Sequence, residues 1–159
     1  MATTNRTTDR GTAYFPQLVA ERLDIALCRA SAAVARAADV HAAREGLGVG
    51  QHLVLQMLDA VGPCSQQTLS EELRIDRSVM VGICDDLERA GQVRRERNPH
   101  DRRSYAVTIT DSGRQRLAAA QASIPAFLED TFHALTDDER GQLSTLLAKL
   151  LQAGVGDPR

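Results

Sequence analysis

The 159-residue sequence is poor in aromatic side chains: it has no tryptophan, two tyrosines and three phenylalanines, so aromatic residues make up 3% of the chain. β-Sandwiches depend on aromatic and β-branched residues, whereas packed helices can be built from alanine and leucine. The shortage therefore favours a helical core. The length suits one domain.

Cysteine is also scarce. Cys28, Cys64 and Cys84 are odd in number and form no C-x-x-C pair, which argues against a disulfide framework and fits a reducing cytosol. Histidine and cysteine show no close metal-ligand spacing, and the chain has no nucleophile elbow, phosphate-binding loop or H-E-x-x-H motif. We therefore expect no metal, no cofactor and no enzymatic activity.

Long apolar runs and a signal-peptide pattern are absent, and the segment from Ala2 to Thr12 is polar. We expect a soluble, cytoplasmic protein with no membrane association and a flexible tail over residues 1–12. The net charge of −2 does not indicate a nucleic-acid partner. Between Gln92 and Tyr105, however, five arginines stand against two acidic residues, a local net charge of +3 that can contact phosphate.

Apolar residues recur at helical spacing over most of the chain. The pattern predicts helices over residues 16–44, 51–60, 66–73, 77–90, 111–134 and 137–152. Pro125 predicts a kink or break inside the fifth of them, and Thr136 with Glu139 forms a capping box before the last.

The last predicted helix carries a leucine stripe, formed by Leu143, Leu146, Leu147, Leu150 and Leu151. The stripe exceeds what a small domain needs to bury. It either packs within the chain or forms a dimer interface with the first helix, and we favour the dimer.

A helix-turn-helix is predicted over residues 66–90, with Asp76 as the cap of the second helix. Four residues of that helix are spaced to face the core: Met80, Ile83, Cys84 and Leu87. Four others share the opposite face: Ser78, Val81, Gly82 and Asp85. This second face would enter a major groove of DNA.

A β-hairpin is predicted over residues 92–110, directly after the helix pair. Tyr105, Val107 and Ile109 alternate with smaller residues as in a strand, and residues 93–97 would form the partner strand. The turn chemistry of Asn98-Pro99-His100-Asp101 lies between the two strands. A charged hairpin in this position is a wing.

Together, these segments resemble the MarR family of transcription regulators. The resemblance covers about residues 50–117 and is carried by GPCSQQTLSEEL, IDRS, the D-x-L-E-x-x-G run and NPHDRRSYAVTIT. Asp101, Arg103 and Thr110 fit the family's D-x-R…[LI]-T wing signature.

The resemblance implies a mostly α fold, a winged helix-turn-helix with N- and C-terminal dimerisation helices and one β-hairpin wing, in a single domain over residues 13–154. It further implies a homodimer that binds a pseudo-palindromic operator in double-stranded DNA, as a ligand-responsive repressor. The DNA-contact candidates are Ser65, Gln66, Arg77, Ser78, Val81, Gly82, Arg95, Asp101, Arg102 and Arg103. Arg103 would reach the minor groove, with Asp101 holding it in place.

Val81 and Gly82 depart from the family, whose recognition helices often carry threonine and arginine there. Gly82 also costs helix stability, by about 1 kcal/mol relative to alanine. Either Val81 meets thymine methyl groups while Gly82 lets the backbone come close, or base readout is weak and specificity comes from the wing and DNA shape. The same departure suggests a second function, a dimeric module that binds another protein.

Relatives commonly bind small phenolic anions, so a small aromatic or anionic effector is expected here. Candidate lining residues are Arg22, Cys28, His41 and His52, although histidines in such positions are more often structural than ligand-binding. A cysteine-based redox response through Cys28 and a small-molecule carrier unlinked to DNA are the alternatives.

Overall fold

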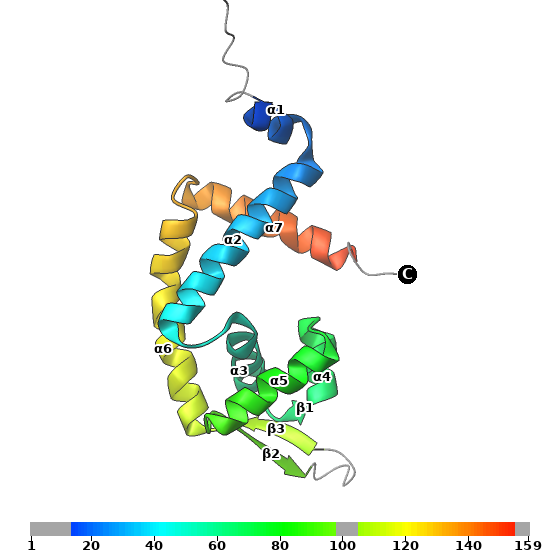
Figure 1. The fold of residues 1–159 in the computed structure, drawn as a ribbon, viewed down its shortest axis with the longest axis vertical. Coiled ribbons are helices and arrows are strands. Elements are labelled where there is room, and N and C mark those ends of the chain that lie inside the picture. Colours follow the sequence, from blue (N-terminus) through cyan, green and yellow to red (C-terminus); the bar gives the residue numbers. More distant parts are fainter. Residues whose placement is uncertain (1–13, 98–104, 155–159) are drawn as a thin grey trace, which may run out of the picture. The chain divides into compact units, whose positions relative to one another are not determined.

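The computed structural model of the chain describes residues 14–97 and 105–154. The fold is mostly helical with a small antiparallel sheet, as predicted (Figure 1). The elements in chain order are α1 (Tyr14–Glu21), α2 (Leu23–Glu45), α3 (Val49–Val61), β1 (Cys64–Ser65), α4 (Gln66–Leu73), α5 (Arg77–Arg89), β2 (Val93–Arg97), β3 (Tyr105–Ile109), α6 (Asp111–Thr131) and α7 (Asp137–Gln152).

The chain forms two compact units, Met1–Val40 and His41–Arg159. The prediction of a single domain over residues 13–154 stays a prediction. α1 and most of α2 belong to the first unit, and every later element belongs to the second.

The first unit corrects the prediction of one uninterrupted helix over residues 16–44, because the helix breaks at Arg22. The backbone hydrogen bonds around the break persist: Leu18 accepts from the Arg22 N–H at 3.0 Å, and Arg22 accepts from the Ala26 N–H at 2.9 Å. The Arg22 guanidinium donates two hydrogen bonds to Asp24, at 2.9 and 2.6 Å. Asp24 lies in the first turn of α2, where a carboxylate stabilises the new helix start.

The helix-turn-helix of the second unit is confirmed, and its boundaries follow from local chemistry. Ser65 caps α4 by accepting from the Thr68 N–H at 3.0 Å. Arg74 ends α4 in the left-handed conformation, with φ of 51°. The turn is closed by Ser70, whose hydroxyl donates to the Ile75 carbonyl at 2.6 Å.

The sheet has three strands in the order β1-β3-β2. β2 and β3 form the predicted hairpin, with Val93 opposite Ile109 and Arg97 opposite Tyr105. The sequence pattern missed β1, a two-residue strand that places Ser65 opposite Ala106. Two residues are too few to show an alternating pattern, so only the pairing reveals this strand.

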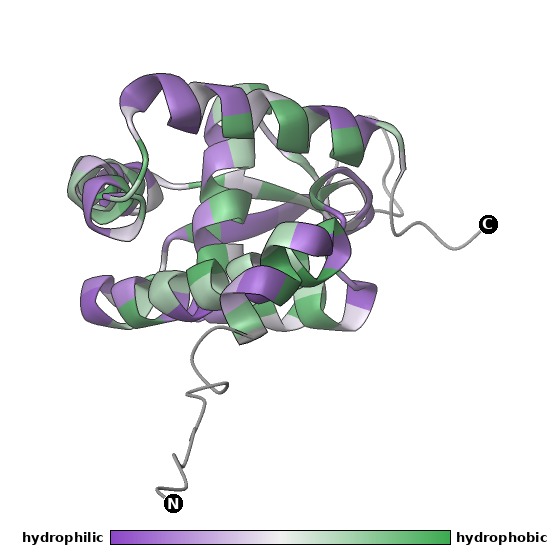
Figure 2. Ribbon diagram, turned by 90° about the horizontal axis from the view of Figure 1, so that it is seen from above, coloured by the Kyte–Doolittle hydropathy of each residue, from purple (hydrophilic) through white to green (hydrophobic). Residues whose placement is uncertain are grey.

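One apolar core lies in the second unit, where α3 packs against α4, α5, α6 and β3. Its largest fully buried side chains are Leu55, Leu58, Leu69, Met80, Leu87, Val54, Val107 and Cys84. Hydrophobic and hydrophilic residues alternate along the helical ribbons around it (Figure 2). This packing fixes the position of α5 and leaves its other face outward.

α6 runs through Pro125 without a break, so the break considered from the sequence is wrong. Proline removes the hydrogen bond to the carbonyl four residues earlier, here that of Gln121. Both Gln121 and Pro125 are exposed, so water can solvate the freed carbonyl. α7 begins as predicted, with Thr136 and Glu139 in a capping box.

Candidate nucleic-acid interface

α5 separates a buried face from an exposed one, largely as its sequence predicts. Met80, Cys84 and Leu87 are buried, and Ile83 packs partly against them. Ser78, Val81 and Gly82 are exposed. Together with Asp85 they form what we call the outer face of α5, which is available to a partner.

The N-terminal end of α5 combines a tight cap with unpaired cations. Asp76 Oδ1 accepts from the Ser78 N–H at 2.8 Å and from the Ser78 hydroxyl at 2.5 Å. These hydrogen bonds lower the pKa of Asp76, so its carboxylate stays charged at neutral pH. Arg74 and Arg77 flank the cap; both are exposed, and neither has an ion-pair partner among the described residues. An anion approaching this end would meet two arginines beside the Asp76 carboxylate, which already occupies the helix N-terminus.

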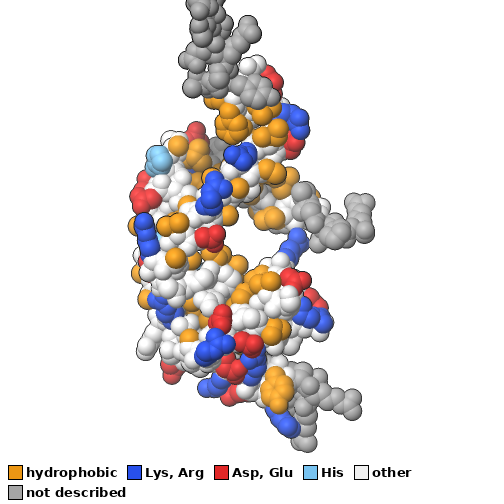
Figure 3. Space-filling model, viewed as in Figure 1, with side chains coloured by type: hydrophobic (Ala, Val, Ile, Leu, Met, Phe, Trp, Pro, Cys, Tyr) orange, Lys and Arg blue, Asp and Glu red, His pale blue; other side chains and the backbone are white. Residues whose placement is uncertain are grey.

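Asp85 and Arg95 form a contact that the sequence pattern did not indicate. The Arg95 guanidinium reaches back from β2 to α5, where Nη2 lies 2.5 Å from Asp85 Oδ1 and Nη1 pairs with Glu88. The Arg95 N–H also donates to Glu88 Oε1 at 3.1 Å. Only 23% of the Arg95 side chain is exposed. Arg95 therefore holds the wing against α5, and its charge is already compensated. Acidic and basic side chains mix over α5 and β2 (Figure 3).

Thr110 joins three elements at the base of the wing. Its hydroxyl donates to the Gly91 carbonyl at 2.7 Å and accepts from the Gly113 N–H at 3.1 Å, which caps α6. Its own N–H donates to the Gln92 carbonyl at 3.0 Å. Gly113 must be glycine, because a Cβ there would lie 2.1 Å from Gln92 O. The end of α5, the wing and the start of α6 are thus locked together.

The other DNA-contact candidates have mixed outcomes. Ser65 and Gln66 are partly buried at the start of α4; the Ser65 oxygen acts as the cap, and Gln66 Nε2 is buried without a hydrogen-bond partner among the described residues. Asp101, Arg102 and Arg103, with the predicted turn from Asn98, lie outside the described residues. Their roles at DNA stay predictions.

The four effector candidates fall in different units. Arg22 and Cys28 lie in the first unit, both exposed, with Arg22 paired to Asp24. His41 lies in the second unit, where its ring stacks on Phe127 with centroids 4.8 Å apart and Nε2 lies 3.1 Å from Ser123 Oγ. These contacts give His41 a structural role. The prediction that all four line one cleft stays a prediction.

His52 is partly buried in α3, and this burial lowers the pKa of its imidazole. It is therefore mainly neutral at pH 7. A neutral imidazole can donate or accept a hydrogen bond, but it offers no charge to an anionic effector.

A hollow of about 530 Å³ lies between the starts of α3 and α5, a volume within the range of small-molecule sites. Most of its lining is apolar: Gly48, Val49, Gly50, Gln51, Leu53, Ile75, Val79 and Ile83. Gly50 brings the two helices close, since a Cβ there would lie 2.6 Å from Ile83 Cδ1. This hollow was not predicted from the sequence. The signal was the apolar Val49 and Val79, which the helical pattern leaves outside the core.

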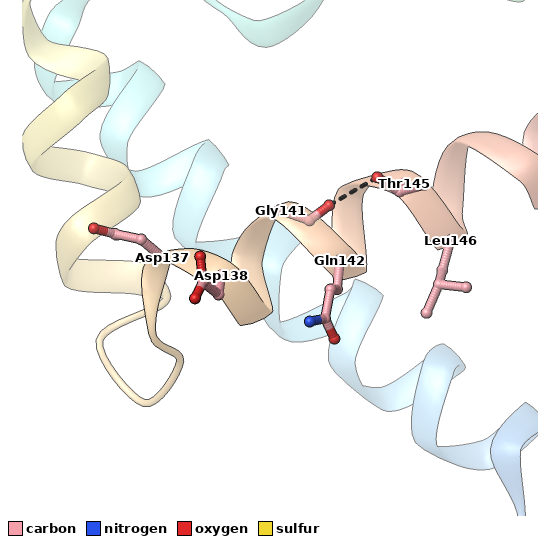
Figure 4. A pocket seen from close by; sticks show the side chains of 6 residues that line it. All are labelled: Asp137, Asp138, Gly141, Gln142, Thr145 and Leu146. Atoms are coloured by element: carbon pink, nitrogen blue, oxygen red, sulfur yellow. Dashed lines mark hydrogen bonds between the residues drawn. The ribbon is translucent and has the colours of Figure 1, made fainter.

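A second hollow is lined by Asp137, Asp138, Gly141, Gln142, Thr145 and Leu146 (Figure 4). All six residues belong to α7, and Thr145 donates to the Gly141 carbonyl within that helix at 2.9 Å. A single helix supplies only one wall, so we assign no ligand to this surface.

Two of the three cysteines are poorly suited to redox sensing. Burial raises the pKa of the Cys64 and Cys84 thiols, which disfavours the reactive thiolate. Cys28 is exposed, and its redox role stays a prediction. Within residues 14–97 and 105–154, no three metal-binding side chains of histidine, cysteine, aspartate or glutamate gather in one place.

None of the helices in the described part of the chain combines the length and apolar character needed to span a bilayer.

Residues 45–104 match the model of the MarR family. A Thauera aromatica protein, described as regulating transcription of the hcr operon, is 34% identical over 106 residues, which cover 67% of this chain and 64% of that protein. The matched segment thus spans just under two thirds of that relative.

Two solved structures extend the similarity over most of the chain. The transcriptional repressor CouR, bound to a 23-mer DNA duplex, is 34% identical with a TM-score of 0.77, covering 84% of this chain and 95% of CouR. Bordetella bronchiseptica BpsR, in a structure concerned with regulation of DNA binding by 6-hydroxynicotinic acid, is 25% identical with a TM-score of 0.71, covering 80% of this chain and 97% of BpsR.

Proposed function

Because this chain belongs to the MarR family, we propose that it is a transcription regulator that binds double-stranded DNA as a homodimer and releases it in response to a small molecule. The observation that carries the proposal is the exposed outer face of α5, with Arg74 and Arg77 beside its N-terminal end. α5 would be the recognition helix in the major groove, and the wing would contact the adjacent backbone and minor groove.

The DNA-contact roles divide by chemistry. Arg77 would contact phosphate at the N-terminal end of α5, and Arg102 and Arg103 would contact DNA from the wing. Arg95 would act as a positioning residue, because its guanidinium is already bound to Asp85 and Glu88. Compensating Asp85 also removes a negative charge from the surface that would face DNA.

Homodimer formation is supported by exposed leucines on α7. Leu146, Leu150 and Leu151 expose 58, 41 and 61% of their surface. A stripe of this kind is costly in water and favours burial against a second copy of the chain. Two recognition helices would then reach the two halves of a pseudo-palindrome, with the protein acting as a cytoplasmic repressor.

Besides the four residues expected from the sequence, the apolar hollow between α3 and α5 is a second candidate site for an effector. The hollow borders Ile75, Val79 and Ile83, so an occupant would contact the recognition helix directly. An aromatic molecule that prefers one setting of α5 would shift the population between DNA-binding and released forms.

DNA binding is tested by selecting fragments from random and genomic DNA and measuring their affinity at several salt concentrations. We expect selective binding, with an association constant whose logarithm falls linearly with the logarithm of the salt concentration. Arg77→Ala should reduce the salt slope by about 1. Arg89→Ala is the matched control, since Arg89 lies at the other end of α5 and pairs with Asp86 at 2.7 Å. No selectivity for any fragment would instead support a protein-binding module.

A further inference from the structure

The outer face of α5 has few hydrogen-bond donors to offer to base edges. The Ser78 hydroxyl donates to Asp76 Oδ1 at 2.5 Å. Val81 and Gly82 have no polar side-chain atoms, and Asp85 is an acceptor already paired with Arg95. The chemistry left at the centre of this face is an apolar side chain, Val81, with 43% of its surface exposed.

Gly82 is not explained by packing within the described chain. A Cβ built at Gly82 meets nothing within 4 Å, whereas one built at Gly50 or Gly113 would collide with a neighbour. Glycine nevertheless lowers helix stability relative to alanine. The effect of the missing side chain is to let another surface come close to the α5 backbone.

We propose that α5 recognises thymine through its 5-methyl group, with Val81 making the apolar contact and Gly82 admitting the base-pair edge against the helix. The proposal rests on the proposed function, because it requires α5 to enter a major groove. In that groove thymine alone among the four bases presents a methyl group, and contact with an apolar side chain distinguishes it without a hydrogen bond. Double-stranded DNA with thymines at defined half-site positions is therefore the ligand of this face.

Arg74 and Arg77 support this choice of occupant. They expose positive charge beside the apolar centre, and the pairing of Asp85 with Arg95 limits repulsion of phosphate at its other end. The apolar centre of this surface matches a thymine methyl group in the major groove, and its cationic flank matches the phosphates of the backbone beside that groove.

Uracil substitution provides the test, because replacing thymine by uracil removes the methyl group and keeps base pairing. A fragment that the full-length protein selects from random DNA is synthesised with uracil at each half-site thymine in turn. We expect one or two positions per half-site to weaken binding about 3–5-fold each, the effect of losing one buried methyl contact. Restoring the methyl group at those positions should restore affinity.

Two valine variants assign the effect to Val81. Val81→Ala should bind thymine and uracil fragments with equal affinity. Val61→Ala is the matched control: Val61 is also exposed, by 64%, but is the last residue of α3 and lies outside the outer face. This control variant should still bind the thymine fragment more tightly than the uracil fragment. Because both side chains are exposed, neither variant should impair folding.

Gly82→Ala gives an independent readout. It should raise the melting temperature while weakening binding to the selected fragment about 10-fold, a combination that a purely structural glycine would not produce. Selective binding that is indifferent to uracil would overturn thymine-methyl recognition and leave the proposed function standing. Absence of any sequence-selective binding would overturn both.

Discussion

The guanidinium of Arg95 lies 2.5 Å from Asp85 Oδ1, so an ion pair ties the wing to α5. Glu88 binds the same guanidinium, and the Arg95 side chain is largely shielded from water. Arginine suits this position because its planar group can serve two carboxylates at once.

Arg95→Ala should lower the free energy of unfolding by about 1–2 kcal/mol, because it leaves two carboxylates of α5 close together and uncompensated. Urea unfolding measures this change. Arg94→Ala is the control, since Arg94 forms an exposed pair with Glu96 and should change stability by less than about 0.5 kcal/mol. Equal effects of the two variants would contradict a specific role for Arg95.

Gly113→Ala should destabilise the protein by about 2–3 kcal/mol, because the new methyl group would collide with the Gln92 carbonyl and with Ile109. Gly141→Ala should stabilise it by about 0.5–1 kcal/mol, since Gly141 lies inside α7 with open space around it. Thermal unfolding of both variants checks whether the melting temperature falls for the first and rises for the second. A neutral Gly113→Ala would show that the wing base can relax.

His52 should make stability depend on pH. Burial holds its pKa below the value of 6.5 expected in the unfolded chain. As the pH falls below about 6.5, the unfolded state takes up a proton before the folded state does, so the free energy of unfolding decreases. His52→Gln should flatten this decrease. An NMR titration of His52 with a midpoint at or above 6.5 would refute the explanation.

A Leu146→Glu/Leu150→Glu double variant should be monomeric at micromolar concentration, as measured by light scattering after size exclusion. Both leucines are exposed within the chain, so circular dichroism should show an unchanged helical content. Thr145→Glu, on the opposite side of α7, should remain dimeric. A dimeric double variant would remove α7 from the proposed interface.

Much of this fold could be predicted because local chemistry decides it. The bounds of α4 and α5 follow from Ser65 and Asp76 as caps, and the capping box of Thr136 sets the start of α7. Hydrophobic spacing was enough to identify the buried face of α5.

The missed features depend on contacts between residues distant in the sequence or on competing local interactions. The partners of Arg95 lie seven and ten residues away on another element, so its charge suggested a DNA contact. The helix breaks at Arg22, where the sequence pattern predicts a continuous helix, and the Arg22 guanidinium pairs with Asp24 at this break. The hollow between α3 and α5 required the two helices to be placed in space.

The hydrogen bonds of Thr110 couple α6 to α5 and the wing, so that a movement of α6 is transmitted to both. The 21 residues of α6 span about 30 Å, and one end is fastened to both the end of α5 and the wing. A tilt of α6 by a few degrees would move α5 and the wing together by a few ångström, without any change inside that unit. In the proposed homodimer, contacts on the distal half of α6 would therefore change the spacing between the two copies of α5.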